Sequence, residues 1–158
     1  MLSRESALEE IFSRHGSDAV YITNTGYISR AIFDLYPESD NIFYMQGSMG
    51  LSPAIGLGVA LCTEKDVVAI SGDGSLLMHL GITHNIRDYQ TEGRNNLYVY
   101  VLDNGCHESV GAYKAPTLER EYPGVAHIYK ISTDGKKERV GIKCKENSKA
   151  VQEFIKNG

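Results

Sequence analysis

Two oxygen-bearing side chains, Asp73 and Asn104, follow the two most apolar runs of the chain. Asp73 lies between two glycines just after Val67–Ile70, and Asn104 comes just after residues 97–102. Short runs of β-branched and other apolar residues that end in turn residues predict buried strands. Neighbouring parallel strands end at the same edge of a sheet, which is where open α/β sheets bind ligands. A carboxylate and an amide oxygen that meet there suit a hard cation such as Mg²⁺ and a diphosphate.

Each residue of this pair also has a plainer interpretation. Asp73 precedes a helical pattern formed by Leu76, Leu77, Leu80, Thr83 and Ile86. Asp is a common N-cap residue, so Asp73 could simply cap that helix. Asn104-Gly105 is a common turn dipeptide. Gly74 and Ser75 open the same helix, and backbone N–H groups at the start of a helix can hold a phosphate.

Two upstream segments, Thr25–Arg30 and Phe43–Gly58, favour the metal–diphosphate interpretation. With Gly72-Asp73-Gly74 and Asp103-Asn104 they resemble the C-terminal, cofactor-binding half of thiamine diphosphate (ThDP)-dependent 2-oxo acid decarboxylases. The resemblance is to the branch that acts on phosphonopyruvate and sulfopyruvate, and it covers roughly residues 1 to 116. It implies ThDP and Mg²⁺ as cofactors and a small 2-oxo acid as substrate.

The resemblance also implies roles for individual residues. The metal ligands would be the side chains of Asp73 and Asn104 and the main-chain carbonyl of Cys106, and the diphosphate would contact Thr25, Gly26, Gly74 and Ser75. The chain departs from the family pattern in two ways. Asp103 stands where the first asparagine of an Asn-Asn pair is usual, and the spacing from Asp73 to Asn104 is a few residues longer. An extra carboxylate near the metal puts the ligand set in question.

The turn Gly47-Ser48-Met49 would meet the aminopyrimidine ring of the cofactor. By resemblance, Met49 is the apolar wedge that bends ThDP, and the Gly47 carbonyl accepts a hydrogen bond from its 4′-amino group. A methionine between glycines is otherwise a common core filler. His107 begins a His-Glu-Ser-Val-Gly run similar to one in the family, which implies a catalytic contact with substrate. Its alternative is an ordinary surface-loop histidine.

Composition excludes several other classes of protein. The 158 residues suffice for one domain with a core, and the net charge of −4 with mixed signs gives no nucleic-acid-binding stripe. Three widely spaced cysteines favour a reducing compartment over a disulfide framework. No apolar run reaches membrane length. We therefore expect a cytoplasmic protein without a membrane or nucleic-acid partner. Gly56-x-Gly58 lacks the third glycine of a dinucleotide site and predicts close helix–sheet packing instead.

The order of the predicted elements implies an α/β fold, an open and mostly parallel sheet with helices on both faces. Helices are expected over the following segments: residues 3–15, 27–35, 52–62, 76–86 and 148–156. Strands are expected over residues 19–23, 41–45, 67–70 and 97–102, with a C-terminal hairpin of 128–132 and 139–144 joined through Asp134-Gly135. The region 114–124 shows no periodicity. We expect residues 1–158 to form one ThDP-binding domain.

The resemblance implies that this domain works with a second chain. In the family a glutamate from the pyrimidine-binding domain activates the cofactor, and residues 1–158 leave no room for that domain. We therefore expect an oligomer with an alpha-type subunit that supplies the glutamate. Two alternatives remain: a subunit of another ThDP enzyme, such as a carboligase or oxidoreductase, and a non-catalytic ThDP-binding module. A third alternative is an α/β binder of other small molecules, in which Asp73 only caps its helix.

Overall fold

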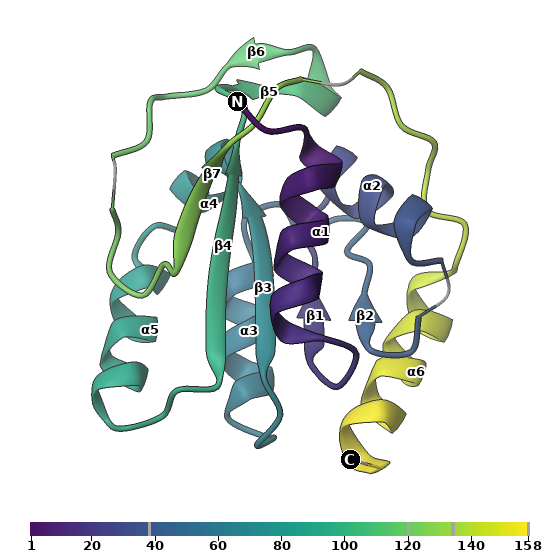
Figure 1. Ribbon diagram of the computed structural model, residues 1–158, viewed down its shortest axis with the longest axis vertical. Coiled ribbons are helices and arrows are strands. Elements are labelled where there is room, and N and C mark those ends of the chain that lie inside the picture. The colour runs from purple at the N-terminus through teal and green to yellow at the C-terminus, as the bar shows by residue number, and fades with distance from the viewer. Residues whose placement is uncertain (38, 120, 134, 158) are drawn as a thin grey trace.

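The chain folds around one five-stranded, fully parallel sheet with the strand order β2-β1-β3-β4-β7 (Figure 1). The structure is a computed structural model that describes residues 1–37, 39–119, 121–133 and 135–157. The sheet strands are β1 (Val20–Ile22), β2 (Ile42–Phe43), β3 (Val67–Gly72), β4 (Leu97–Asp103) and β7 (His127–Lys130). The predicted α/β class and parallel sheet are confirmed.

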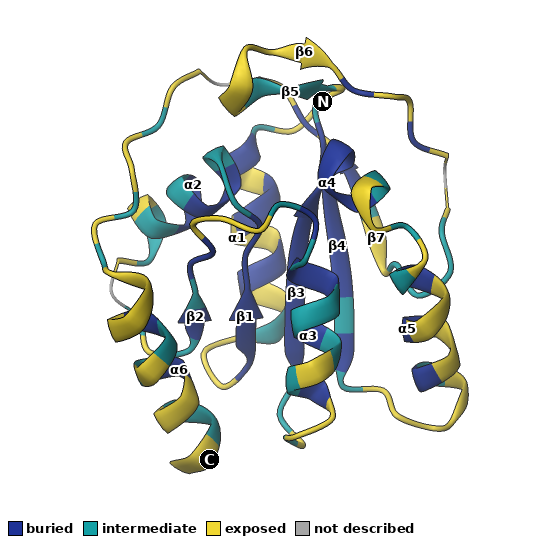
Figure 2. Ribbon diagram, turned by 180° about the vertical axis from the view of Figure 1, so that it is seen from behind, coloured by how far each residue is buried: buried dark blue, intermediate teal, exposed yellow. Residues whose placement is uncertain are grey.

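Helices cover both faces of the sheet because successive strand residues point to opposite sides. Helices α1 (Arg4–His15) and α2 (Tyr27–Leu35) pack on the face formed by Val68, Ile70, Tyr100 and similarly oriented residues. Helices α3 (Ser52–Ala60), α5 (Ile82–Thr91) and α6 (Cys144–Asn157) pack on the other, which includes Val67, Ala69 and Val99. Figure 2 shows the buried strands between helices whose outer faces are exposed.

The strand order reverses next to β1, and this creates the crevice that the site occupies. The chain runs from β1 outward to β2, then returns across the sheet through α3 to β3 on the other side of β1. Connections on opposite faces leave a gap at the carboxyl ends of β1 and β3, the usual ligand position in such sheets. The short helix α4 (Asp73–Met78) begins there, and the small antiparallel pair β5 (Cys106–His107) and β6 (Tyr113–Lys114) lies above it (Figure 1).

Two sequence predictions are wrong. The predicted C-terminal hairpin does not form, because β7 pairs in parallel with β4 and residues 139–144 contain no strand. Val140 and Ile142 alternate because they pack against the α1–α2 side of the core, not because they pair with a strand. Of the predicted turn, Asp134 lies outside the described residues. The single helix expected over 76–86 is two helices, since α4 ends at Met78 and α5 begins at Ile82, after Gly81.

The remaining elements agree with the sequence within a few residues. Ser3 caps α1 by accepting a hydrogen bond from the Ser6 N–H, as its position predicts. Helix α6 begins at Cys144, four residues earlier than expected, and its Asn147 bonds the backbone of edge strand β2 at Ile42 and next to it at Tyr44. Within the part of the chain that the structure describes, no helix has the length and apolarity needed to span a membrane.

Candidate active site at the strand ends

A cavity at the carboxyl ends of β1, β3 and β4 gathers most of the predicted site residues. Those that line it are Thr25, Met49, Asp73, Gly74, Ser75, Asn104, Cys106 and His107. Gly26 borders a neighbouring cavity instead, which shares Thr25 with the first. Gly47 and Ser48 are exposed and line neither cavity. The segments that follow β1, β2, β3 and β4 are far apart in the sequence, and they converge here because their strands end at one edge.

Asp73 is a buried carboxylate with one oxygen left over. The residue is 4% exposed, and its Oδ2 has no hydrogen-bond partner among the described residues. Burial raises the pKa of this carboxyl, the nearby charge of Asp103 adds to the rise, and the N–H groups of Gly74 and Gly105 oppose it. Gly72, not Asp73, is the N-cap residue of α4, so Asp73 is not a simple helix cap. A buried, unpartnered carboxylate oxygen is well suited to coordinate a cation.

Asp103, the residue that departs from the family pattern, is neutralised locally. Its Oδ1 accepts a hydrogen bond from the Gly105 N–H at 3.0 Å, and its Oδ2 is paired with the ammonium of Lys130 on β7. Asp103 is buried, whereas the Lys130 side chain is 61% exposed. The Asp103 carboxylate therefore stabilises the turn after β4 and links β4 to β7.

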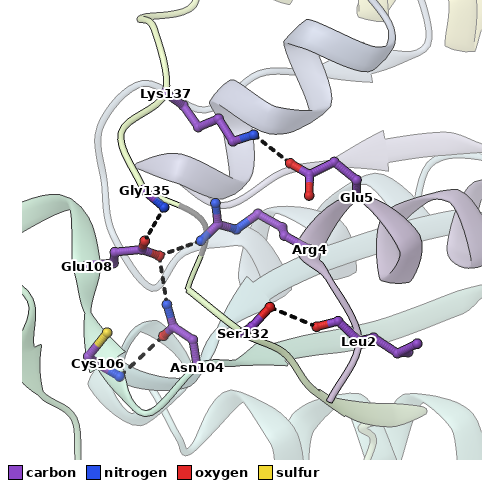
Figure 3. Close-up of polar contacts among 9 residues, drawn as sticks. All are labelled: Leu2, Arg4, Glu5, Asn104, Cys106, Glu108, Ser132, Gly135 and Lys137. Atoms are coloured by element: carbon purple, nitrogen blue, oxygen red, sulfur yellow. Dashed lines mark hydrogen bonds and ion pairs between the residues drawn. The ribbon is translucent and has the colours of Figure 1, made fainter.

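Asn104 has each end of its amide engaged by a different partner (Figure 3). Its Nδ2 donates to Oε2 of Glu108 at 2.9 Å, and its Oδ1 accepts from the Cys106 N–H at 3.2 Å. Burial raises the pKa of the Cys106 thiol, and the charges of Glu108 and Asp73 add to the rise. The thiol therefore stays protonated at neutral pH, and a neutral thiol is a poor Mg²⁺ ligand. The part of Cys106 that suits a Mg²⁺ ligand is therefore its main-chain carbonyl, the group that the resemblance implies.

Thr25 lies beside a buried asparagine that the sequence reasoning did not select. Asn24 follows β1, donates through Nδ2 to Oγ of Ser75 at 2.8 Å, and has no hydrogen-bond partner for its Oδ1 in the described residues. Asn24 and Asp73 therefore both bring unpartnered buried oxygens to the cavity. The position of Asn24 at a strand end, directly before Thr25, was the feature of the sequence that could have identified it.

Helix α4 has only six residues, so its first N–H groups matter more for binding a phosphate than its dipole does.

The loop after β4 closes over two glycines of the site. The imidazole of His107 lies against Gly74, where a Cβ would come 2.1 Å from Cε1. Ser109 packs against Gly26 in the same way, with 2.8 Å between its Oγ and the position of a Cβ. Gly26 also has a φ of +74°, which favours glycine. His107 is thus at the cavity, not a free surface-loop residue.

The turn at residues 47–50 presents only Met49 to the cavity. Ser48 has a φ of +58°, which is unusual for a non-glycine residue, and Gly50 has a φ of +88°. This backbone geometry turns the half-buried Met49 side chain toward the carboxyl ends of the strands. The position fits the expected wedge, whereas Gly47 offers only its exposed backbone.

A second residue that sequence reasoning missed is Arg4, which lines the cavity from α1. It is 1% exposed and shares the buried face of the helix with Ala7, Leu8 and Ile11. The feature of the sequence that could have identified Arg4 is an arginine at an apolar position of an amphipathic helix, since a buried charge requires a specific partner.

The described residues contain no group of three or more His, Cys, Asp or Glu side chains arranged to hold a metal ion.

Comparison with known families decides the family. The model of the C-terminal TPP-binding domain of thiamine pyrophosphate enzymes matches residues 23–157, which is most of the chain. The chain belongs to this family. Thiamine pyrophosphate is another name for ThDP. The family membership confirms the resemblance found in the sequence. The match begins at residue 23 and extends beyond residue 116, where the sequence analysis found no resemblance.

Several relatives carry names that agree with the family. Phosphonopyruvate decarboxylase of Streptomyces viridochromogenes is 39% identical over 124 residues, which cover 78% of this chain and 30% of that protein. Sulfopyruvate decarboxylase subunit beta of Methanothermobacter thermautotrophicus is 39% identical over 112 residues, which cover 71% of this chain and 58% of that protein. The chain therefore spans about a third to somewhat over half of the length of these relatives.

A solved structure supports the fold. An X-ray structure of a putative thiamin diphosphate-dependent enzyme from Mycobacterium smegmatis superposes with a TM-score of 0.60 and 20% sequence identity. The match covers 75% of this chain and 24% of that chain. It confirms the arrangement of sheet and helices.

Proposed function

We propose that this chain is the cofactor-binding subunit of a ThDP-dependent 2-oxo acid decarboxylase. The observation that carries the proposal is the buried Oδ2 of Asp73, unpartnered among the described residues, in a cavity also lined by Asn104. Gly72, not Asp73, is the N-cap residue of α4, so helix capping does not explain the burial of this carboxylate. Membership of the TPP-binding family supports ThDP as the ligand, and the oxygen ligands favour Mg²⁺ as the metal.

The residues present fit this cofactor and metal. Asp73, Asn104 and the Cys106 carbonyl would hold Mg²⁺, and Gly74, Ser75, Thr25 and Gly26 would face the diphosphate. Both unpartnered oxygens, on Asp73 and Asn24, border the same cavity and would gain partners when it is filled. The metal, together with the backbone N–H groups at the start of α4, would offset the repulsion between a protein of net charge −4 and a diphosphate.

The chain contributes binding and shape to the reaction. When bound, ThDP supplies the thiazolium that accepts electrons as a 2-oxo acid loses CO₂. Asp73 and Asn104 would hold the metal that binds the diphosphate, and Met49, which lines the same cavity, would be the apolar wedge against the cofactor. In the loop from His107 to Ser109, the first residue lies against Gly74 and the last against Gly26. His107, which lines the cavity, would hydrogen-bond the substrate.

Substrate and partner follow from the relatives. Their names include phosphonopyruvate decarboxylase and sulfopyruvate decarboxylase, so we propose a 2-oxo acid with an anionic group at C3. Three of the matching relatives are named subunit beta. We therefore propose an alpha-type partner chain that supplies the glutamate for the pyrimidine, in a larger oligomer. The cysteines Cys62, Cys106 and Cys144 are free, which supports a reducing, cytoplasmic location.

The test is turnover by the chain with and without its partner. The tagged chain is purified from its own cells together with bound protein, and CO₂ release from phosphonopyruvate and sulfopyruvate is measured with ThDP and Mg²⁺. We expect the complex to release CO₂ from one of them and the isolated chain to show weak or no turnover. Strong turnover by the homogeneous chain would refute the need for a partner. ThDP binding without turnover of any 2-oxo acid by the complex would identify a non-catalytic module.

A further inference from the structure

Arg4 and Glu108 form a buried ion pair between α1 and the loop that follows β4 (Figure 3). The Arg4 side chain is 2% exposed and the Glu108 side chain is 11% exposed. Burying two charges carries a desolvation cost that only good geometry and further hydrogen bonds offset. A pair this deeply buried beside the predicted metal ligands therefore calls for an explanation beyond fold stability.

Glu108 has additional partners, and one of them is Asn104. Its Oε2, which accepts from Arg4, also accepts from Nδ2 of Asn104 at 2.9 Å. Its Oε1 accepts from the Gly135 N–H at 3.1 Å. Both oxygens of the Glu108 carboxylate are thus held in place, Oε2 by Arg4 and Asn104 and Oε1 by the Gly135 N–H.

These contacts determine which end of the Asn104 amide is the oxygen. A carboxylate can only accept hydrogen bonds and a backbone N–H can only donate one. Nδ2 must therefore face Glu108, and Oδ1 must face the Cys106 N–H, as the structure has it. A rotation of the amide by 180° would bring oxygen against carboxylate and NH₂ against N–H.

We propose that Glu108, held in place by Arg4, is the positioning residue that presents the Asn104 oxygen to the metal. This inference rests on the proposed function, in which Asn104 is a metal ligand. Oδ1 has a second lone pair beyond the one that faces Cys106. A carboxylate that accepts a hydrogen bond from Nδ2 also polarises the amide and increases the negative charge on Oδ1. The oxygen then becomes a better ligand, as happens at other metal sites where a ligand is hydrogen-bonded by a neighbouring group.

The inference extends the site to a part of the chain outside the family match. Arg4 precedes residues 23–157, the range that the family model covers. The segment before α1 is tied to β7, because Leu2 forms a parallel bridge with Ile131 and accepts from the Ser132 N–H at 3.0 Å. Helix α1 is therefore anchored beside the loop that follows β4, and Arg4 is its contact with Glu108 in that loop.

The same structure offers a matched control. Glu5, the neighbour of Arg4 on α1, forms an ion pair with Lys137 at 2.6 Å, two residues after Gly135 (Figure 3). This pair joins the same helix to the same downstream segment, whereas the Asn104 amide bonds Glu108 and the Cys106 N–H. The paired variant E5M/K137M therefore reports the effect of losing an α1 ion pair without losing the Asn104 contact.

The experiment compares Glu108→Met, R4M/E108M and E5M/K137M in the full chain. R4M/E108M is included because Glu108→Met alone leaves Arg4 facing an apolar side chain and could fail to fold. The first readout is the side-chain amide signal of Asn104 in NMR spectra without cofactor, assigned by its loss in Asn104→Asp. We expect one amide proton of the wild type to be shifted downfield by the carboxylate, to lose that shift in both Glu108 variants, and to keep it in E5M/K137M.

The second readout is Mn²⁺ affinity with saturating ThDP, measured by electron paramagnetic resonance. We expect about 10- to 100-fold weaker binding in both Glu108 variants. E5M/K137M should bind Mn²⁺ like the wild type, and Glu108→Met should cause no further loss in an Asn104→Ala background. The positioning role would be overturned if the Glu108 variants kept the wild-type Mn²⁺ affinity or the wild-type Asn104 amide signal. It would also be overturned if Glu108→Met weakened Mn²⁺ binding further in the Asn104→Ala background. A wild type that binds no Mn²⁺ with ThDP would overturn the proposed function itself.

Discussion

The imidazole of His107 lies directly against Gly74, so that a Cβ on Gly74 would be 2.1 Å from its Cε1 and 2.6 Å from its Nδ1. Real Cβ atoms do not make such contacts, so any side chain at position 74 must displace the histidine. The contact links the start of α4, where we propose the diphosphate binds, to the loop that we propose meets the substrate. A glycine is therefore required here by close approach, not by its backbone angles.

Gly74→Ala should displace His107 and destabilise the protein by about 1–3 kcal/mol, the usual cost of overpacking. The control is Gly58→Ala in α3, where an added Cβ meets nothing within 4 Å. Alanine is the better helix former, so that variant should gain about 0.5–1 kcal/mol. Urea unfolding measures both changes. Equal stability changes in the two variants would show that the His107 contact is not tight.

Asp73→Asn should remove cofactor binding and yet stabilise the cofactor-free protein at neutral pH. The wild-type residue buries a charge whose Oδ2 has no partner among the described residues, and a buried unsatisfied group costs about 1–3 kcal/mol. We expect a gain of about 1 kcal/mol in unfolding free energy from denaturant curves. Asp103→Asn is the control: it loses the pairing with Lys130 and should not be stabilising.

The gain in Asp73→Asn should depend on pH. The pKa of Asp73 is raised in the folded state by burial, so the folded protein holds this proton more tightly than the unfolded chain. The penalty is absent below the ordinary carboxyl pKa of about 4 and develops as the pH rises through the higher folded pKa. The variant should therefore match the wild type in acid and exceed it at neutral pH. A gain that is constant from acid to neutral pH would contradict this.

Met49→Ala should reduce turnover by the complete assembly more than it reduces ThDP affinity. The side chain lines the cavity but carries no anchor for the diphosphate, so we expect affinity within about threefold and turnover reduced by about tenfold or more, which corresponds to about 1.4 kcal/mol of barrier. Met78→Ala, at an exposed methionine, is the control. Collapsed affinity with normal turnover at saturation would rule out the wedge role.

The sheet and the convergence of the site were predictable because they depend on local signals. The apolar runs before Asp73 and Asn104 are continuous, rich in β-branched residues and followed by turn residues, and parallel strands must end at one edge. The C-terminal hairpin was not predictable, because Val140 and Ile142 alternate like a strand while they pack against the helix layer. Periodicity records which side of a segment is buried, not which partner buries it.

The parts of the site that sequence reasoning missed depend on contacts between distant elements. Arg4 lies more than one hundred residues from Glu108, and nothing local to either residue shows the pair. Asn24 gains its interest only from the oxygen that remains unpartnered after Nδ2 bonds Ser75. Glu108 belongs to the His-Glu-Ser-Val-Gly run that the sequence shows after Cys106, but its hydrogen bond to the Asn104 amide is a property of the folded loop.

Calorimetry of ThDP binding, with Mg²⁺ and with excess EDTA, tests the central claim most directly. Because we propose that the diphosphate binds through a metal held by Asp73 and Asn104, the wild-type chain should bind ThDP with Mg²⁺ and lose that binding in EDTA. Asp73→Ala should show no binding in either condition, because it lacks a direct metal ligand. Equal ThDP affinity with Mg²⁺ and in EDTA, or undiminished binding by Asp73→Ala, would contradict the account.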